Sequence, residues 1–195
     1  MYTVLSDTEI AKHVLKYHFL TVENKNDLYE CWIFCKILDA LSDIYKLKFK
    51  EGSRSDGVAT FQTSDGLLKI TYQKRYETEW MDKDKWLQDK PDIAIEYKNG
   101  NSIIIDAKNS DYVKAGPYYC REQMDSYVDS ANAGYGILVF SLANTGLWKE
   151  ITRYDKQKIV WTHLTPSNSA SIEDSASSAN LRKIIDLIQT FNLDS

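Results

Sequence analysis

The stretch that most constrains the fold of this chain runs from residue 90 to residue 108. Apolar side chains alternate with smaller or charged ones over residues 93–97, and residues 103–105 are three consecutive isoleucines. The pair Asn99-Gly100 between these runs is typical of a tight turn, so the sequence predicts two short strands joined as a hairpin. The second run leads directly into charged residues, which a buried strand has no packing reason to carry.

Two charged residues, Asp106 and Lys108, end the second strand. Because side chains alternate along a strand, Ile104, Asp106 and Lys108 share one face. A third charged residue, Asp92, stands just ahead of the first strand. Charges in these positions indicate a task other than packing.

The turn decides where Asp92 points. A two-residue loop would place Asp92 on the opposite face of the sheet from Asp106. A three-residue loop, with Gly100 in the left-handed conformation, pairs Tyr97 with Asn101 and places Asp92 directly across from Asp106. We expect the three-residue loop, because only this register brings the two carboxylates to one face.

Two facing carboxylates need a compensating charge. In the three-residue register the Cβ atoms of Asp92 and Asp106 would lie roughly 4.5–5.5 Å apart. Carboxylates this close repel each other unless one is protonated or a cation lies between them. Because Lys108 lies on the same face, we expect a cation, and not protonation, to balance the two carboxylates.

These residues resemble a known signature. Pro91-Asp92, followed by Asp106-Ala107-Lys108, is similar to the motif of the PD-(D/E)XK nuclease superfamily. Two other tripeptides in the chain match the second half of this motif, but only the one at 106–108 ends an apolar strand and follows a Pro-Asp pair at hairpin distance. The position of the tripeptide, more than its composition, carries the resemblance.

Two further elements of the sequence indicate which members of the superfamily the chain resembles most. Glu30 opens an upstream helix, where many of these nucleases carry an acidic residue. Gln123 and Tyr127 give the Gln-x-x-x-Tyr pattern seen after the lysine in RecB-like and McrC-like members. The combination looks most like the nuclease domain of McrC-like restriction components, over about residues 26–141.

The resemblance implies a metal site. Asp92 and Asp106 would bind Mg²⁺, or Mn²⁺, together with water, since Mg²⁺ takes hard oxygen ligands and keeps part of its hydration. The carbonyl of Ala107 would supply another oxygen. Glu30 would be a ligand of a second site or would orient the attacking water; as a first-turn glutamate it is also favoured by the helix dipole alone.

The resemblance also implies roles for three residues that do not bind metal. Lys108 would position the attacking water and stabilise the extra negative charge at phosphorus. Gln123 and Tyr127 would brace Lys108 or hold the strand being cut.

The order of expected elements predicts an α/β fold with a mixed sheet and helices packed on its faces. This order agrees with the α-β-β-β-α-β core of the restriction-endonuclease-like fold. We expect a single domain over residues 1–195, with its core at about 26–141 and a C-terminal strand and helix at 158–192. Expected helices lie at 7–20, 26–45 and 118–132, the last ended by Gly134, and expected strands lie at 58–63, 67–74, 135–142 and 158–164.

Three segments are expected to be irregular. Residues 109–117 form a loop that would grip the substrate, and residues 167–178 form a Ser/Ala/Asn-rich linker. Residues 77–88 form a loop or short helix across the mouth of the site. This last segment carries Trp80 and Trp86, which would cover the core or stack on bases.

The composition is that of a folded domain. A length of 195 residues fits one domain, and 43% hydrophobic and 12% aromatic residues are globular values. We expect neither a signal peptide nor a membrane span, because no apolar run comes near the roughly 18 residues that a span needs. The three cysteines, without Cys-x-x-Cys spacing, indicate reduced thiols in a cytoplasmic protein and disfavour a zinc or iron–sulfur site.

The net charge of −4 does not indicate nucleic-acid binding over the whole surface. Basic residues instead gather in two stretches, at 45–54 and at Lys69, Lys74 and Arg75. A solvated edge strand and a phosphate track both fit these stretches. The nearby acidic site favours the phosphate track.

The function expected from these features is a Mg²⁺-dependent deoxyribonuclease in restriction or defence against foreign DNA. Two alternatives stay open: a catalytically silent nuclease fold used for DNA binding or assembly, and a carboxylate pair that holds a structural ion. The expected partner is DNA, and the resemblance leaves room for an NTPase motor or other defence subunit and for a homodimer. McrC-like proteins usually carry a preceding domain, so the chain fits a piece of a longer protein.

Overall fold

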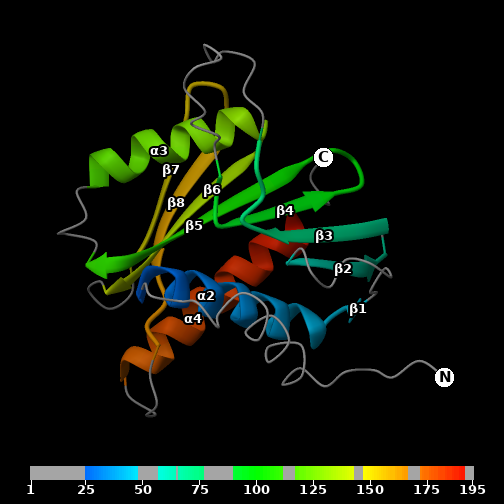
Figure 1. Ribbon diagram of the computed structural model, residues 1–195, viewed down its shortest axis with the longest axis horizontal. Coiled ribbons are helices and arrows are strands. Elements are labelled where there is room, and N and C mark those ends of the chain that lie inside the picture. Colours follow the sequence, from blue (N-terminus) through cyan, green and yellow to red (C-terminus); the bar gives the residue numbers. More distant parts are fainter. Residues whose placement is uncertain are drawn as a thin grey trace.

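A computed structural model describes residues 25–47, 57–64, 66–76, 90–111, 117–142, 147–166 and 172–191. These residues form one eight-stranded sheet with helices on both faces (Figure 1). The helices are α2 (Lys25–Ser42), α3 (Pro117–Ser130) and α4 (Ile172–Thr190). The strands are β1 (Lys46–Leu47), β2 (Val58–Thr63), β3 (Gly66–Tyr72), β4 (Ile93–Tyr97), β5 (Ser102–Asp111), β6 (Tyr135–Leu142), β7 (Trp148–Thr152) and β8 (Lys158–His163).

The sheet is mixed, with strand order β1-β2-β3-β4-β5-β6-β8-β7. Pairing is antiparallel from β1 to β5 and parallel from β5 through β6 to β8, and β7 closes the edge antiparallel to β8. The predicted α/β class is confirmed: α2, β3, β4, β5, α3 and β6 follow one another in the expected order, with β2 added before β3. No helix in the described part of the chain is long and apolar enough to cross a membrane.

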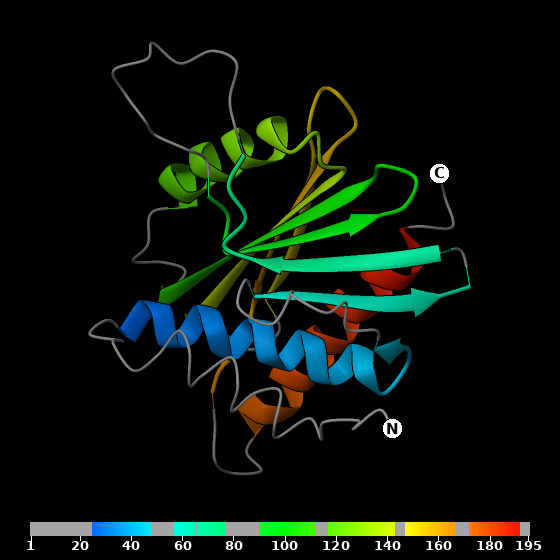
Figure 2. The same cartoon turned by 45° about the vertical axis from the view of Figure 1, so that its right-hand side comes forward.

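The two faces of the sheet carry separate cores. Helices α2 and α4 cover one face and α3 covers the other, as two views of the molecule show (Figures 1 and 2). Alternation along the strands divides the side chains between them: Ile93 and Ile105 face α2 and α4, whereas Ala94 and Ile104 face α3. Each fully buried isoleucine stabilises the fold by about 1.5–3 kcal/mol, so both helix layers are held firmly.

The hairpin between β4 and β5 has the predicted register. Ile93 pairs with Ile105, and the amide of Tyr97 donates to the carbonyl of Asn101 at 2.9 Å. The loop is therefore three residues long, and Gly100 at its end has a φ of 89°. Glycine tolerates this conformation because it has no Cβ.

Strand β5 differs from its prediction beyond Lys108. A loop was expected from residue 109, but β5 continues to Asp111, paired in parallel with β6. The register shifts between Lys108 and Asp111. Such an irregularity bends a strand, and this one begins directly after the charged residues that end the apolar run. Residues 112–116 lie outside the described part of the chain.

The C-terminal end of α3 also differs from its prediction. Asn132, with a φ of 46°, ends the helix in place of Gly134. The amide of Asn132 donates to the carbonyl of Asp129 at 3.1 Å, and the amide of Ala133 donates to the carbonyl of Val128 at 2.8 Å. This is the bonding pattern of a Schellman motif, in which asparagine can replace glycine.

The predicted linker at 167–178 is wrong over its second half, because α4 already begins at Ile172. Alanine is the best helix former and serine is only mildly unfavourable, so a Ser/Ala-rich stretch is compatible with a helix that the sheet supports. Asn180 provides part of that support, since its side-chain amide donates to the carbonyl of His163 at 3.1 Å. Strand β7 was not predicted. The expected helix at 7–20 and the segment with Trp80 and Trp86 lie outside the described residues.

Helix α3 lies unusually close to β6 at Gly136. A Cβ atom at this position would meet Met124 Sδ at 2.5 Å and Val128 Cγ2 at 2.7 Å. Arg153, which follows β7, fastens the same helix: its buried guanidinium contacts Asp129 at 2.9 Å and Asp125 at 3.3 Å. The position of α3 is therefore set by close packing and by ion pairs together.

Gly136→Ala is expected to destabilise the protein by about 1–3 kcal/mol, because the added methyl overpacks the contact between α3 and β6. Urea denaturation measures the change. The direction is informative, since alanine normally stabilises a strand relative to glycine by about 0.5–1 kcal/mol. A variant as stable as the wild type would contradict the close approach of α3.

Candidate active site

Asp92 and Asp106 face each other where β4 begins and the apolar run of β5 ends. The observed register, continued by one pair beyond Ile93 and Ile105, sets the two aspartates opposite one another. Both side chains are nearly inaccessible to solvent, with 8% of Asp92 and 3% of Asp106 exposed. The structure thus buries two carboxylates side by side.

The backbone of β5 holds Asp92. Its Oδ2 accepts a hydrogen bond of 2.7 Å from the amide of Ala107. Its own carbonyl accepts one of 2.6 Å from the amide of Gln73, which follows β3. Asp92 is therefore fixed between two neighbouring strands.

Lys108 provides the positive charge of the site. Its Nζ lies 2.5 Å from Oδ2 of Asp106 and donates to Oε1 of Gln123 at 2.9 Å. The amide nitrogen of Gln123 donates in turn to the hydroxyl of Tyr127 at 2.6 Å. Gln123 and Tyr127 stand one turn apart on α3, so this helix carries a short polar chain that ends on the lysine.

Glu30 approaches from the other helix layer. It lies in the first half of α2, is half-buried, and accepts a hydrogen bond of 3.2 Å from Nε2 of Gln73. The charge of Glu30 acts on Asp92, while Glu30 has a hydrogen bond with Asp92 and is repelled by the charge of Asp106. All six predicted side chains are thus brought into one neighbourhood: Glu30, Asp92, Asp106, Lys108, Gln123 and Tyr127.

The carboxylates are hard to ionise in this environment. Burial, followed by the charges of Asp106 and Glu30, raises the pKa of Asp92 well above its ordinary value. Burial also raises the pKa of Asp106, although Lys108 opposes the shift. Burial is again the main cause of the raised pKa of Glu30.

Lys108 shows the opposite balance. Burial alone would lower the pKa of its ammonium group, but Asp106 and then Asp92 outweigh that effect, and the pKa is raised. Lys108 is therefore charged at neutral pH. The pKa values of Asp92 and Asp106 stay raised despite Lys108, so a second cation would stabilise the ionised carboxylates.

The donor set fits Mg²⁺. Within the described ranges no three His, Cys, Asp or Glu side chains form a group that could hold a metal ion by themselves. Mg²⁺ does not require such a group, because it is usually bound through one or two carboxylates and keeps several waters. The facing oxygens of Asp92 and Asp106 match that requirement, and the environment that opposes their negative charges would be relieved by a divalent cation.

Sequence reasoning missed Gln73. It lies directly after β3, and its side-chain amide also accepts a hydrogen bond of 2.8 Å from Nζ of Lys90. Glutamine is an ordinary residue at a strand end, so nothing in its type marks it. Its place follows from the pairing of β3 with β4, which the local sequence does not specify.

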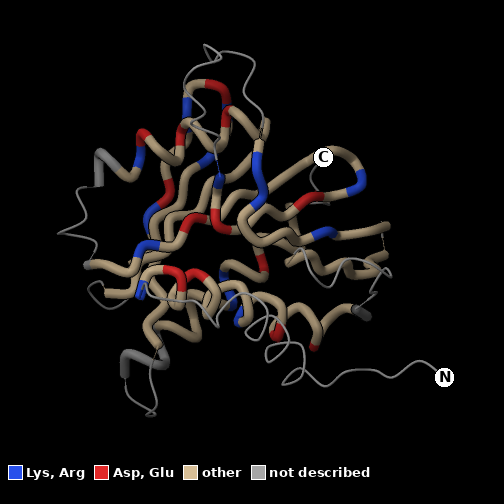
Figure 3. The backbone as a smooth tube through the Cα atoms, viewed as in Figure 1, with Lys and Arg blue, Asp and Glu red and all other residues tan. Residues whose placement is uncertain are grey.

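Two of the three residues of the predicted basic cluster on and after β3 form ion pairs. Lys69 lies 3.8 Å from Glu96, and Lys74 pairs with the same carboxylate. Over the described backbone, positive and negative residues are interspersed (Figure 3). The stretch at 45–54 lies mostly outside the described residues.

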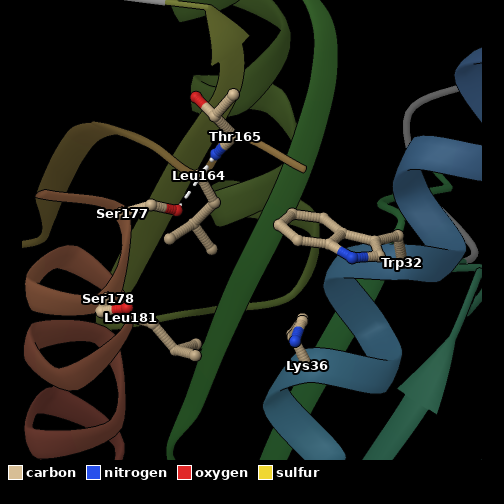
Figure 4. A pocket seen from close by; sticks show the side chains of 7 residues that line it. All are labelled: Trp32, Lys36, Leu164, Thr165, Ser177, Ser178 and Leu181. Carbon is tan, nitrogen blue, oxygen red and sulfur yellow. Dashed lines mark hydrogen bonds between the residues drawn. The ribbon is translucent and has the colours of Figure 1, made fainter. Parts of the chain in front are cut away.

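A pocket of about 230 Å³ lies elsewhere, between α2, α4 and the end of β8 (Figure 4). Trp32 and Leu181 form part of its wall, and Lys36 stands at Trp32 with its Nζ 5.9 Å from the centre of the ring. Trp32 lies two residues after Glu30 on α2, about 200° around the helix. The pocket therefore opens on the side of α2 away from the carboxylates.

Comparison with known proteins gives a fold and no family. No family model and no curated protein matches the chain. Among solved structures, it is similar to a chain of the refined half-complex from a tetradecameric assembly of Thermococcus gammatolerans McrB AAA+ hexamers with bound McrC. The identity is 15%, the TM-score is 0.53, and the similarity covers 83% of this chain and 33% of that one. This chain thus spans about a third of its neighbour, and the two share a fold.

Asp92→Asn is expected to stabilise the metal-free protein at neutral pH. Because the pKa of Asp92 is raised on folding from an ordinary 3.8, its contribution to stability is complete below that value and is lost as the pH rises through the folded-state pKa. Asparagine stays neutral, and its oxygen can still accept the bond from Ala107.

Urea denaturation at about pH 4 and about pH 8 measures the effect, and the gain over wild type should be larger at the higher pH. The exposed Asp43 supplies the control, since Asp43→Asn removes a carboxylate from the surface. Equal changes at both pH values would count against a buried, repelled carboxylate.

Proposed function

We propose that this chain is the nuclease domain of a McrC-like restriction or defence system, a Mg²⁺-dependent hydrolase that cuts DNA. One observation carries the proposal: buried Asp92 and Asp106 face each other, with the ammonium group of Lys108 held at Asp106. This set combines oxygen ligands for a hard cation with a fixed positive charge, and phosphodiester cleavage needs both.

The residues of the site divide the work. Asp92 and Asp106 would hold the metal, with the carbonyl of Ala107 as a further ligand. Mg²⁺, when bound, would supply Lewis-acid stabilisation of the phosphate charge. Glu30 would bind a second ion or orient the attacking water.

Lys108 would act on the reacting atoms. Its Nζ would position the water that attacks phosphorus and stabilise the charge that builds up as the bond to the leaving oxygen breaks. Gln123 accepts one of its hydrogen bonds, and Tyr127 fixes the amide of Gln123, so the ammonium group would be aimed before the substrate arrives. Such preorganisation avoids reorientation during the reaction.

The shared fold supports the McrC-like assignment. The solved neighbour contains McrB AAA+ hexamers with bound McrC. By analogy we propose that an AAA+ NTPase is a partner of this chain. Cys31, Cys35 and Cys120 form no disulfide among the described residues, which fits a reducing, cytoplasmic location.

A silent nuclease fold used only for DNA binding would have no need of the complete carboxylate set. The retention of Glu30, Asp92 and Asp106 together with braced Lys108 favours the enzyme. A structural ion at the aspartates would likewise leave the chain from Lys108 to Tyr127 without a role.

Metal binding should depend on Asp106 and hardly on Lys108. Asp106→Asn should abolish the heat of Mn²⁺ or Mg²⁺ binding in a calorimetric titration, because a charged oxygen ligand is lost. Lys108→Ala should largely spare it, since an ammonium group has no lone pair to offer a metal. Equal binding by wild type and Asp106→Asn would exclude this metal site.

Cleavage should depend on Lys108 and DNA affinity should not. We expect Lys108→Ala to lower the cleavage rate by on the order of 10²–10³, the usual cost of removing one group that stabilises transition-state charge. DNA affinity should change little, because one phosphate contact is a small part of a salt-dependent sum.

Both quantities are measured at one salt concentration on wild type, Lys108→Ala and the control Lys98→Ala, which removes an exposed lysine of the hairpin loop. A proportional fall in cleavage and affinity would assign Lys108 to binding. No cleavage by wild type with Mg²⁺ or Mn²⁺ would favour the silent fold.

A further inference from the structure

Gln73 occupies a backbone conformation that its residue type does not favour. It follows β3 directly and has a φ of 51°, in the left-handed region. Non-glycine residues adopt this region rarely, and asparagine and aspartate do so more readily than glutamine. Glycine would adopt this conformation with less strain, so we expect the glutamine side chain to make a contact that compensates for the strain.

The backbone of Gln73 places it at the site. Its amide donates to the carbonyl of Asp92 at 2.6 Å, next to the pair formed by Tyr72 of β3 and Ile93 of β4. The left-handed turn therefore occurs where the chain passes Asp92, one of the two facing carboxylates.

The side chain of Gln73 joins two charged residues. Oε1 accepts a hydrogen bond of 2.8 Å from Nζ of Lys90, and Nε2 donates one of 3.2 Å to Oε2 of Glu30. The bond from Lys90 fixes which end of the amide is oxygen, because an ammonium group can only donate. The nitrogen must then face Glu30, and the contact with the carboxylate is a donor bond.

Glu30 needs such a contact. Asp27 and Asp106 repel its charge, and it is only half-buried, so its side chain has room to turn towards solvent. Two hydrogen bonds oppose this repulsion: the bond from Nε2 of Gln73, at 3.2 Å, and a weaker one with Asp92. Loss of the bond from Gln73 would therefore remove the larger of the two contacts that offset the repulsion.

We propose that Gln73 is a positioning residue, which holds the Glu30 carboxylate towards Asp92 and Asp106 through its amide nitrogen while Lys90 fixes the amide oxygen. The proposal rests on the proposed function and deepens it, because it assigns the orientation of the third carboxylate to a residue outside the motif. Gln73 itself contacts neither metal nor substrate in this assignment.

Gln73→Gly separates the side chain from the backbone. Glycine suits a φ of 51°, so the turn is kept and the amide is removed. The matched control is Lys156→Gly, which makes the same change at another left-handed residue, with a φ of 70°, in the turn between β7 and β8. Gln73→Met is the second variant, because it keeps the backbone strain and the length of the side chain and removes only the polar end.

Four quantities are measured for each protein: Mn²⁺ affinity by calorimetry, the cleavage rate at saturating Mn²⁺, DNA affinity and the thermal midpoint. Gln73→Gly and Gln73→Met should each lose about 10- to 100-fold in Mn²⁺ affinity or cleavage rate, the usual effect of removing a group that orients a metal ligand. DNA affinity should be unchanged, and Lys156→Gly should match wild type in all three binding and cleavage measurements.

The Glu30→Gln background provides the decisive comparison. If Gln73 acts through Glu30, Gln73→Gly should cause little further loss once Glu30 has been changed, since residues that act as a unit are not additive. A full additional loss in that background would overturn the proposal, as would wild-type Mn²⁺ affinity and cleavage in both Gln73 variants.

The two levels of the hypothesis fail differently. If wild type binds Mn²⁺ and cuts DNA but the Gln73 variants equal it, only the role of Gln73 is wrong. If wild type neither binds Mn²⁺ nor cuts DNA, the proposed function and the role of Gln73 both fall. If Gln73→Gly loses the fold, Gln73→Met decides between the same outcomes.

Discussion

The register of one hairpin determines what the rest of this molecule can do. A loop of three residues sets Asp92 opposite Asp106, and a loop of two would have put them on different faces of the sheet. That choice depends on a left-handed glycine, Gly100, where an added Cβ would meet nothing within 4 Å, so the φ of 89° and not crowding favours glycine. The surrounding cores then fix the hairpin so firmly that the repulsion between the carboxylates cannot separate them.

The structure offsets that repulsion from three directions. The Ala107 amide holds one carboxylate, Lys108 pairs with the other, and the amide of Gln73 holds the third, on α2. Each of these groups is itself held, by the strand pairing, by Gln123, or by Lys90. The three carboxylates are therefore held close together, and a bound cation would stabilise their ionised forms.

The features of the fold and site that the sequence predicted are those set by residues close to one another in the chain. The hairpin register and the face shared by Asp106 and Lys108 follow from strand alternation and turn geometry, and the spacing of Gln123 and Tyr127 follows from the helix period. Other features depend on partners that are remote in sequence. Gln73 gains its place through the pairing of β3 with β4, and polar residues after Lys108 remain in a strand only because β6 lies beside them.

The two helix layers have a consequence for the chain as it is being made. Glu30 comes from one helix layer, and Gln123 and Tyr127, which hold Lys108, come from the other. The two aspartates face each other only once the hairpin between the layers has formed. On the ribosome, α2 and the hairpin emerge before α3, so a nascent chain would carry an unaimed lysine until α3 docks on β6. Under the proposed function, the competence to cut DNA would therefore arise only after α3 has docked on the sheet.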